Sequence, residues 1–226
     1  MIYYLFWWLC IITGYPYNLI LFKRKTFYED KSVQSLRVKG GALIISNHCH
    51  FYDYMLNMFA LAPRKLNVVA AEMAFSNPLI RFGMRFFGGI EANRITKSMR
   101  FMDTAAEQIR KGRLVQIFPE GRITTDGSLQ PFKQSYIVIA HRAKAPIIPI
   151  VTDGCYHLFK RTHIMVGKPI YVSDYITSDR RTPTREELAT VNEIVYNKVA
   201  ELRDQLAVLK QQAKKSQKTV KKEDVQ

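Results

Sequence analysis

Short apolar runs alternate with amphipathic stretches through the middle of this 226-residue chain, and this alternation limits the possible folds more than any other feature. Runs at 42–46 (ALIIS), 66–71 (LNVVAA), 114–118 (LVQIF) and 147–151 (IIPIV) have the length and composition of buried strands. Pro149 removes a backbone donor, so we expect the last of them near a sheet edge or a strand end. Helical spacing predicts helices at 96–111, at 134–144 and from 184 to about 209. Together they predict a single α/β domain whose mostly parallel or mixed central sheet is flanked by helices.

The first 22 residues carry no charged side chain, and Lys23, Arg24 and Lys25 follow at once. About 20 apolar residues are enough to span a bilayer. Pro16 interrupts a straight helix, however, and the many Tyr and Trp residues prefer the headgroup interface. A spanning helix and a helix lying in the interface both fit, with a buried soluble helix as the third alternative. We expect residues 1–25 to be a helical membrane anchor at the cell membrane, with the rest of the chain on the cytoplasmic side.

The charge balance predicts an anionic partner. The 34 Lys and Arg residues outnumber the 19 Asp and Glu residues and give a net charge of +15. The 47% apolar content excludes a wholly disordered chain. Residues 210–226 are rich in lysine and are expected to be a disordered tail, which leaves 26–209 as the main folded domain. No nucleic-acid-binding signature is visible, so we expect an anionic membrane surface rather than nucleic acid as the partner.

The first candidate site follows the run at 42–46 directly and reads Asn47-His48-Cys49-His50-Phe51-Tyr52-Asp53. Open α/β sheets bind ligands at the carboxyl ends of their strands. If a helix begins near residue 51, the carboxylate of Asp53 can reach back to His48. A carboxylate on one imidazole nitrogen fixes the tautomer and makes the other nitrogen more basic. The pair is therefore suited to removing a proton from an alcohol.

A second group of residues is suited to binding phosphate. Arg122 lies in Phe118-Pro119-Glu120-Gly121-Arg122, directly after another predicted strand. Arg94 follows a glycine turn, and Lys133 lies a little further along the chain. Guanidinium groups bind phosphate with two parallel hydrogen bonds. For each of these three residues taken alone, a solvated surface charge is the more common interpretation.

Together these segments resemble four ordered motifs of the glycerolipid acyltransferase family, of the lysophosphatidic acid acyltransferase type. Asn47 with His48-x4-Asp53 is similar to the first motif, 89–94 to the second, 118–121 to the third and 145–150 to the fourth. The resemblance implies that His48 is the general base and that Asp53 orients it. It implies that Asn47, Arg94, Glu120, Gly121, Arg122 and Lys133 bind the substrate. It also implies an acyl-CoA or acyl carrier protein donor, a lysophospholipid acceptor, phosphatidic acid as the product, and no metal or bound cofactor.

Two departures from the motifs concern the acceptor. Glu91 and Asn93 stand in the second motif where an aromatic residue and an Asp are usual. Arg122 follows Gly121 directly, a pattern closer to the 2-acylglycerophosphoethanolamine acyltransferases. Another lysophospholipid is therefore the alternative acceptor.

Two other classes of protein are compatible with parts of the sequence. His48, His50 and Asp53, with Cys49 beside them, could ligate a metal in a metallohydrolase, but the other three histidines have no ligand spacing. A non-catalytic basic protein that binds membrane or nucleic acid would explain the charge but not the His–Asp pair. An aromatic-rich segment is predicted either to line an acyl channel or touch lipid, or to pack in the core; it comprises Phe75, Phe82, Met84, Phe86 and Phe87.

Overall fold

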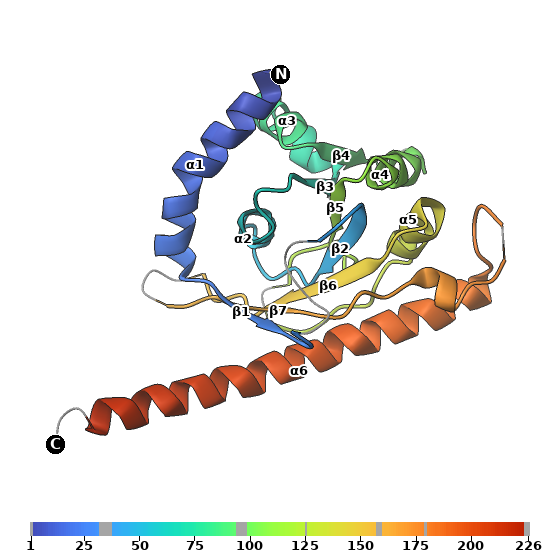
Figure 1. Ribbon diagram of the computed structural model, residues 1–226. Coiled ribbons are helices and arrows are strands. Elements are labelled where there is room, and N and C mark those ends of the chain that lie inside the picture. Colours follow the sequence, from blue (N-terminus) through green and yellow to red (C-terminus); the bar gives the residue numbers. More distant parts are fainter. Residues whose placement is uncertain are drawn as a thin grey trace.

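The computed structural model describes residues 2–31, 38–93, 99–124, 126–156, 160–178 and 180–223. These residues include a seven-stranded sheet with the order β1-β7-β6-β2-β5-β3-β4 (Figure 1). The strands are β1 (Lys25–Tyr28), β2 (Ala42–Ser46), β3 (Leu66–Ala71), β4 (Gly89–Ala92), β5 (Leu114–Ile117), β6 (Ile147–Thr152) and β7 (His163–Val166). The helices are α1 (Ile2–Phe22), α2 (Asp53–Ala60), α3 (Pro78–Phe86), α4 (Arg100–Arg110), α5 (Ser135–Ala143) and α6 (Arg185–Glu223), with short 3-10 turns at Glu72–Phe75 and Val172–Asp174.

All neighbouring strands are parallel except β6 and β7, so the predicted mixed α/β sheet is confirmed. The prediction that Pro149 lies near an edge is wrong, because β6 lies between β7 and β2. The antiparallel strand β7 leaves a gap in its pairing with β6 where Pro149 has no N–H to donate. β7 pairs with β6 only from Ile150 onward, and the chain beyond it returns to bridge Ile147 to Ile170. The carbonyl of Pro149 accepts a bond from Gly167 N across this gap.

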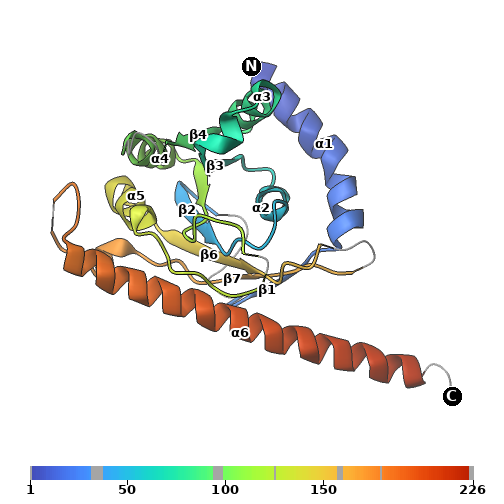
Figure 2. The same ribbon diagram turned by 180° about the vertical axis from the view of Figure 1, so that it is seen from behind.

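Two apolar cores cover the two faces of the sheet, as expected for parallel strands buried on both sides. Leu43 and Ile45 of β2 face the core formed with α4, α5 and α6. Ala42 and Ile44, which alternate with them, face the core formed with α1 and α2. Figure 2 shows α6 lying along the side of the sheet formed by β6, β7 and β1 and extending beyond it, with β3 and β4 at the opposite side.

The N-terminal segment forms one continuous helix through Pro16. Trp7, Ile11 and Phe22 are buried against the domain, and Gly14 lies so close to α2 that a Cβ there would be 2.7 Å from the Phe59 ring. Among the helices whose residues are described, none combines the length and the apolar character needed to cross a bilayer.

The C-terminal helix begins where the sequence predicts. The hydroxyl of Thr184 accepts a bond from Glu187 N (3.2 Å), and Glu187 Oε2 accepts one from Thr184 N (2.7 Å), which is a reciprocal capping box. The expectation that α6 ends near residue 209 and gives way to a disordered tail is not met, because the helix continues to Glu223. The segment 185–223 contains no Gly or Pro, and its Lys, Gln and Ala residues favour helix. The division into 1–25, 26–209 and 210–226 stays a prediction.

Candidate active site

Three loops meet at the carboxyl edge of the central strands. β2 pairs in parallel with β5 on one side and with β6 on the other, so the segments that follow Ser46, Ile117 and Thr152 leave the sheet at the same edge. These segments carry His48, the third motif at 118–121, and Tyr156. The structure therefore brings together residues more than 100 positions apart at the place where open α/β sheets bind ligands.

The His48–Asp53 pair has the geometry that the spacing predicts. Asp53 is the first residue of α2 and is fully buried, while the His48 side chain is 18% exposed. Asp53 Oδ2 lies 2.9 Å from His48 Nδ1 and accepts bonds from the backbone N–H groups of Cys49 (2.7 Å) and His50 (2.8 Å). A carboxylate at a helix N-terminus is also favoured by the helix dipole. With Nδ1 bound to Asp53, Nε2 is the nitrogen that can accept a proton.

The imidazole of His48 is held on its face as well as at Nδ1. It stacks on the Phe118 ring at a centroid distance of 3.9 Å and an angle of 13°. The backbone N–H of His48 donates to Glu120 Oε1 (2.8 Å), and Thr124 N donates to the carbonyl of His48 (2.8 Å). These contacts fix both the ring and its loop before any substrate binds, and such preorganisation lowers the cost of reaching a reactive geometry.

Glu120 and Asn47 are both buried and bonded to backbone groups. Glu120 Oε1 accepts from His48 N, and Oε2 accepts from Gln130 N (2.9 Å). Asn47 exchanges two bonds with Thr152, from Thr152 N to Oδ1 (2.9 Å) and from Nδ2 to the carbonyl (3.1 Å), which tie the ends of β2 and β6 together. The structure thus shows them positioning the loops of the site, and their contact with substrate stays a prediction.

Lys133 lies against Gly121 of the third motif. Gly121 has φ +68°, which favours glycine, and a Cβ there would come within 2.9 Å of Lys133 Nζ and so displace the end of that side chain. Arg122 is exposed and donates to the amide oxygen of Gln130. Arg94, the third predicted phosphate ligand, lies outside the described residues.

The described part of the chain contains no group of three His, Cys, Asp or Glu side chains that could hold the metal ion of the metallohydrolase alternative. Cys49 lies beside the dyad, where burial and then the negative charge of Asp53 raise the pKa of its thiol to about 11. The thiol is therefore protonated at neutral pH and is a poor nucleophile.

Sequence reasoning missed Tyr156. Its hydroxyl donates to Asp53 Oδ1, although the two residues are 103 positions apart and no motif contains Tyr156. Burial and the neighbouring Asp53 carboxylate both raise the pKa of this phenol, so it remains a donor at neutral pH. No periodicity or local spacing could reveal such a contact, because it depends on how β2 and β6 are paired.

The fold and this dyad define a class of α/β proteins that carry a His–Asp pair at the carboxyl edge of a mostly parallel sheet. The sequence model described as Acyltransferase matches residues 25–153. The chain belongs to this acyltransferase family, and the resemblance seen in the sequence motifs is confirmed.

Named relatives agree with this assignment. The chain is 24% identical over 178 residues to the "1-acyl-sn-glycerol-3-phosphate acyltransferase" of Bacillus subtilis, covering 76% of this chain and 86% of that one. It is 30% identical over 128 residues to the human "1-acyl-sn-glycerol-3-phosphate acyltransferase beta", covering 55% of this chain and 45% of the human one. The crystal structure of the "1-acyl-sn-glycerophosphate (LPA) acyltransferase, PlsC" from Thermotoga maritima has the same fold, with a TM-score of 0.62 at 20% identity, over 87% of this chain and 79% of that one.

Proposed function

We propose that this protein transfers an acyl chain from an acyl thioester to the free hydroxyl of 1-acyl-sn-glycerol-3-phosphate and so forms phosphatidic acid. The observation that carries the proposal is the His48–Asp53 pair, held at 2.9 Å at the carboxyl edge of the sheet in a chain of the acyltransferase family. The names of the relatives specify the acceptor. The alternative acceptor, another lysophospholipid, rests on the departures from the motifs at Glu91, Asn93 and Gly121-Arg122.

The reaction follows from the orientation of His48. Nε2 takes the proton of the acceptor hydroxyl while the hydroxyl oxygen forms a bond to the carbonyl carbon of the thioester. The carbon–sulfur bond then breaks, and the thiolate leaves with the proton that His48 held. Asp53 stabilises the imidazolium between these two steps, because its carboxylate faces Nδ1. Every atom and proton is accounted for without a resident cofactor.

We assign Lys133 and Arg122 to the acceptor phosphate, because both lie at the turn of the third motif. Gly121 allows the lysine to lie over the turn, and the guanidinium of Arg122 is exposed at the same turn. Arg94 completes this proposed group. For the donor, acyl-CoA and acyl carrier protein both supply the required thioester.

The surface of α1 and α3 supports membrane association. On α1, Trp8, Leu9, Ile12, Leu19 and Ile20 are 46–67% exposed although the other face of the helix is buried. On α3, Leu79, Ile80 and Phe82 are 54–80% exposed. The ring of Trp7 on α1 contacts the ring of Phe87, which directly follows α3, at a centroid distance of 6.1 Å. Large exposed apolar patches mark interaction surfaces, and a lysophospholipid acceptor resides in a bilayer. This patch is the proposed docking face on an anionic cell membrane, with the catalytic domain on the cytoplasmic side.

The catalytic proposal is tested by His48→Ala. With 1-acyl-sn-glycerol-3-phosphate and acyl-CoA, or acyl carrier protein, the rate of phosphatidic acid formation is expected to fall about 10³-fold or more, as for loss of an essential general base. His141→Gln is the matched control, because this histidine lies on α5 and bonds the carbonyl of Arg180. A His48→Ala rate close to that of wild type would refute the proposal. Running the same assay on lysophosphatidylethanolamine separates the two acceptors.

The membrane proposal is tested by vesicle sedimentation of an Ile12→Glu, Ile20→Glu variant. These side chains are 65% and 67% exposed, so the fold should survive while binding to anionic vesicles is lost. Val208→Glu is the control, because Val208 is 53% exposed on α6, away from α1 and α3. Equal sedimentation of the double variant and wild type would exclude α1 as the docking surface.

A further inference from the structure

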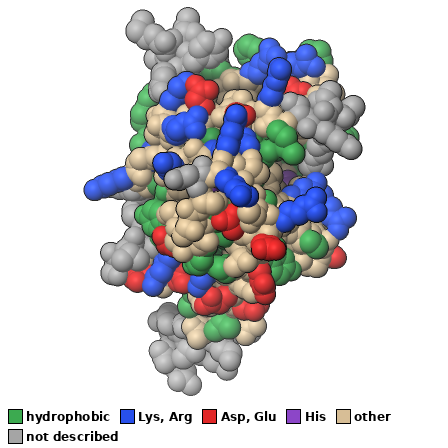
Figure 3. Space-filling model, turned by 90° about the vertical axis from the view of Figure 1, so that its right-hand side faces the viewer, with side chains coloured by type: hydrophobic (Ala, Val, Ile, Leu, Met, Phe, Trp, Pro, Cys, Tyr) green, Lys and Arg blue, Asp and Glu red, His purple; other side chains and the backbone are tan. Residues whose placement is uncertain are grey.

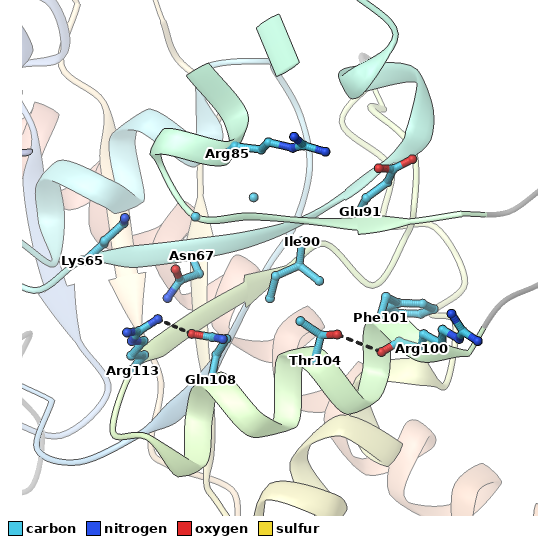
Figure 4. Close-up of a pocket in the computed structure, with 12 residues that line it drawn as sticks. Lys65, Asn67, Arg85, Ile90, Glu91, Arg100, Phe101, Thr104, Gln108 and Arg113 are labelled. Carbon is cyan, nitrogen blue, oxygen red and sulfur yellow. Dashed lines mark hydrogen bonds between the residues drawn. The ribbon is translucent and has the colours of Figure 1, made fainter. Parts of the chain in front are cut away.

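A basic groove of about 420 Å³ lies between α3, β4 and α4, and Glu91 of the second motif lines one end of it (Figure 4). Its lining contains four cations, Lys65, Arg85, Arg100 and Arg113, and one carboxylate, Glu91. In Figure 4, Lys65 and Arg113 lie at one end of the groove and Glu91 at the other. Figure 3 shows Lys and Arg side chains gathered in the upper part of the molecule, at the height of β4 and α4 in Figure 1.

The Lys65–Arg113 end of the groove and His48 lie at opposite ends of the parallel strands. Lys65 directly precedes β3, and Arg113 directly precedes β5, so both lie at amino ends of strands. His48 follows the carboxyl end of β2, which runs parallel to β5, and β5 runs parallel to β3. The two sets of side chains therefore lie at opposite edges, and a ligand at this end is not the reacting hydroxyl.

Two glycines keep one wall of the groove free of side chains. Gly88 has φ +79°, and a Cβ there would be 2.0 Å from Asn67 Oδ1. A Cβ on Gly89 would be 2.8 Å from the carbonyl oxygen of Met84. Any other residue at either position would fill the groove or displace its wall.

Lys65 and Arg113 lie near each other at one end of the groove, and the carboxylate of the lining, Glu91, lies at the other end. Lys65 Nζ donates to the carbonyl of Phe86 (2.9 Å), which fixes the ammonium in place. Burial, and then the positive charge of Arg113, lower the pKa of Lys65. An anion bound between the two groups would remove this repulsion and accept hydrogen bonds from both.

We propose that this groove is a second anion site that binds a phosphate ester, supplied by the headgroup of an anionic membrane lipid. Arg85 connects the groove to the proposed docking face, because it lies on α3, one turn after the exposed Phe82. A lipid held there would lie beside the helix that contacts the bilayer. The source of the phosphate rests on the proposed function, whereas the anion site itself does not. A soluble phosphate ester such as coenzyme A shares this chemistry and forms the second arm of the test.

The test measures equilibrium binding with no turnover, so it remains informative if the enzyme acts on another acceptor. Wild type and an Arg85→Ala, Arg113→Ala variant are titrated with phosphatidylglycerol vesicles, phosphatidylcholine vesicles and coenzyme A. Lys111→Ala is the control for charge, because this exposed lysine at the end of α4 pairs with Glu107 and does not line the groove.

The double variant is expected to bind phosphatidylglycerol vesicles at least about tenfold more weakly, with coenzyme A binding and the control unchanged. A loss confined to coenzyme A would overturn the assignment to lipid. Equal binding by the double variant and wild type in all arms, or an equal loss in Lys111→Ala, would overturn the anion site itself.

A separate observation concerns Tyr156, which connects the catalytic carboxylate to α1. Its hydroxyl donates to Asp53 Oδ1, the oxygen that His48 does not use. Its ring packs edge-on against Phe22 at 5.4 Å and 79°. Phe22 is the last residue of α1 and is 5% exposed. One side chain therefore touches both the proposed membrane helix and the partner of the general base.

We infer that Tyr156 is a positioning residue that sets Asp53 for catalysis and transmits the placement of α1 to it. This inference rests on the proposed function. Asp53 Oδ2 already accepts three bonds, so the tyrosine hydroxyl is what restrains the remaining oxygen among the described contacts. The aromatic contacts with Phe22, Tyr52 and His50 restrain the tyrosine in turn.

Tyr156→Phe keeps the ring and removes only the bond to Asp53. We expect kcat to fall about tenfold with the KM values for both substrates unchanged. Tyr54→Phe is the matched control, because Tyr54 also buries its hydroxyl but donates to the carbonyl of Leu66 (2.8 Å). An unchanged kcat in Tyr156→Phe, with a change in melting temperature equal to that of Tyr54→Phe, would show a merely structural bond.

The link to α1 is tested with Phe22→Leu, alone and combined with Tyr156→Phe, on a short-chain soluble acceptor that needs no vesicle. The two kcat effects should be non-additive, because both variants disturb the same chain of contacts. Independent effects would overturn the coupling while leaving the role of the hydroxyl intact. Inactivity of wild type on every lysophospholipid would instead indicate failure of the proposed function.

Discussion

Asp53→Asn tests most directly whether the buried carboxylate supports catalysis rather than folding alone. The amide oxygen can still accept from the backbone N–H groups of Cys49 and His50, and the amide N–H₂ can donate to a rotated Tyr156 hydroxyl. The shape of the site is therefore retained, and what is lost is the negative charge 2.9 Å from His48 Nδ1.

The expected size of the effect follows from the burial of the pair. Asp53 is fully buried and the His48 side chain is 18% exposed, so the imidazolium formed during proton transfer has little solvent to stabilise it. Removing one partner of a buried ion pair costs about 3–5 kcal/mol. At about 1.4 kcal/mol per factor of ten, kcat should fall about 10²- to 10⁴-fold.

The assay is steady-state release of the donor thiol at saturating concentrations of both substrates, together with a thermal melt of each variant. Asp153→Asn is the matched control, because Asp153 forms a second His–Asp pair at 2.9 Å, with His163 on β7. This control should lose stability but keep kcat. A folded Asp53→Asn enzyme with a kcat within about threefold of wild type would refute the assignment of Asp53 as the partner of the base.

Three further predictions concern the framework of the site. Gly121→Ala should lower the melting temperature, because a non-glycine residue at φ +68° costs about 1–2 kcal/mol. It should also raise the KM for the acceptor, because the added Cβ displaces Lys133. Gly40→Ala is the control: Gly40 has φ +70° with open space around it, so this variant should show the conformational cost alone. Thr184→Ala should cost about 1 kcal/mol in urea unfolding through loss of the capping box, without changing kcat; no loss of stability would mean the cap contributes nothing. Burial opposes ionisation of Glu29, but the bonds from Lys168 N and Lys198 outweigh it and hold the pKa of Glu29 below 4.5. Glu29→Gln should therefore lower the free energy of unfolding at pH 7. The difference in unfolding free energy between this variant and wild type should disappear as the pH falls through that lowered pKa.

Four of the described strands, β2, β3, β5 and β6, were predictable because their apolar runs are short and bounded by polar residues, whereas β1, β4 and β7 were not predicted. The runs at 42–46 and 66–71 match β2 and β3 residue for residue. The position of β6 was not predictable, because the partner that accommodates Pro149 lies 18 residues further along, at Gly167. Local spacing found the His48–Asp53 pair within one turn. It could not find Tyr156, nor show that Glu120 bonds the backbone of His48, because both contacts depend on strand order.

The pairing of β1 with β7 has a consequence for how the chain assembles. Lys25 at the start of β1 pairs with His163, and β1 forms one edge of the sheet. On the ribosome, α1 is synthesised before β1, yet β1 cannot pair until β7 has been synthesised. Contacts so distant in sequence slow folding. The apolar face of α1 can therefore reach a lipid surface before the sheet is complete and before His48 has its final neighbours.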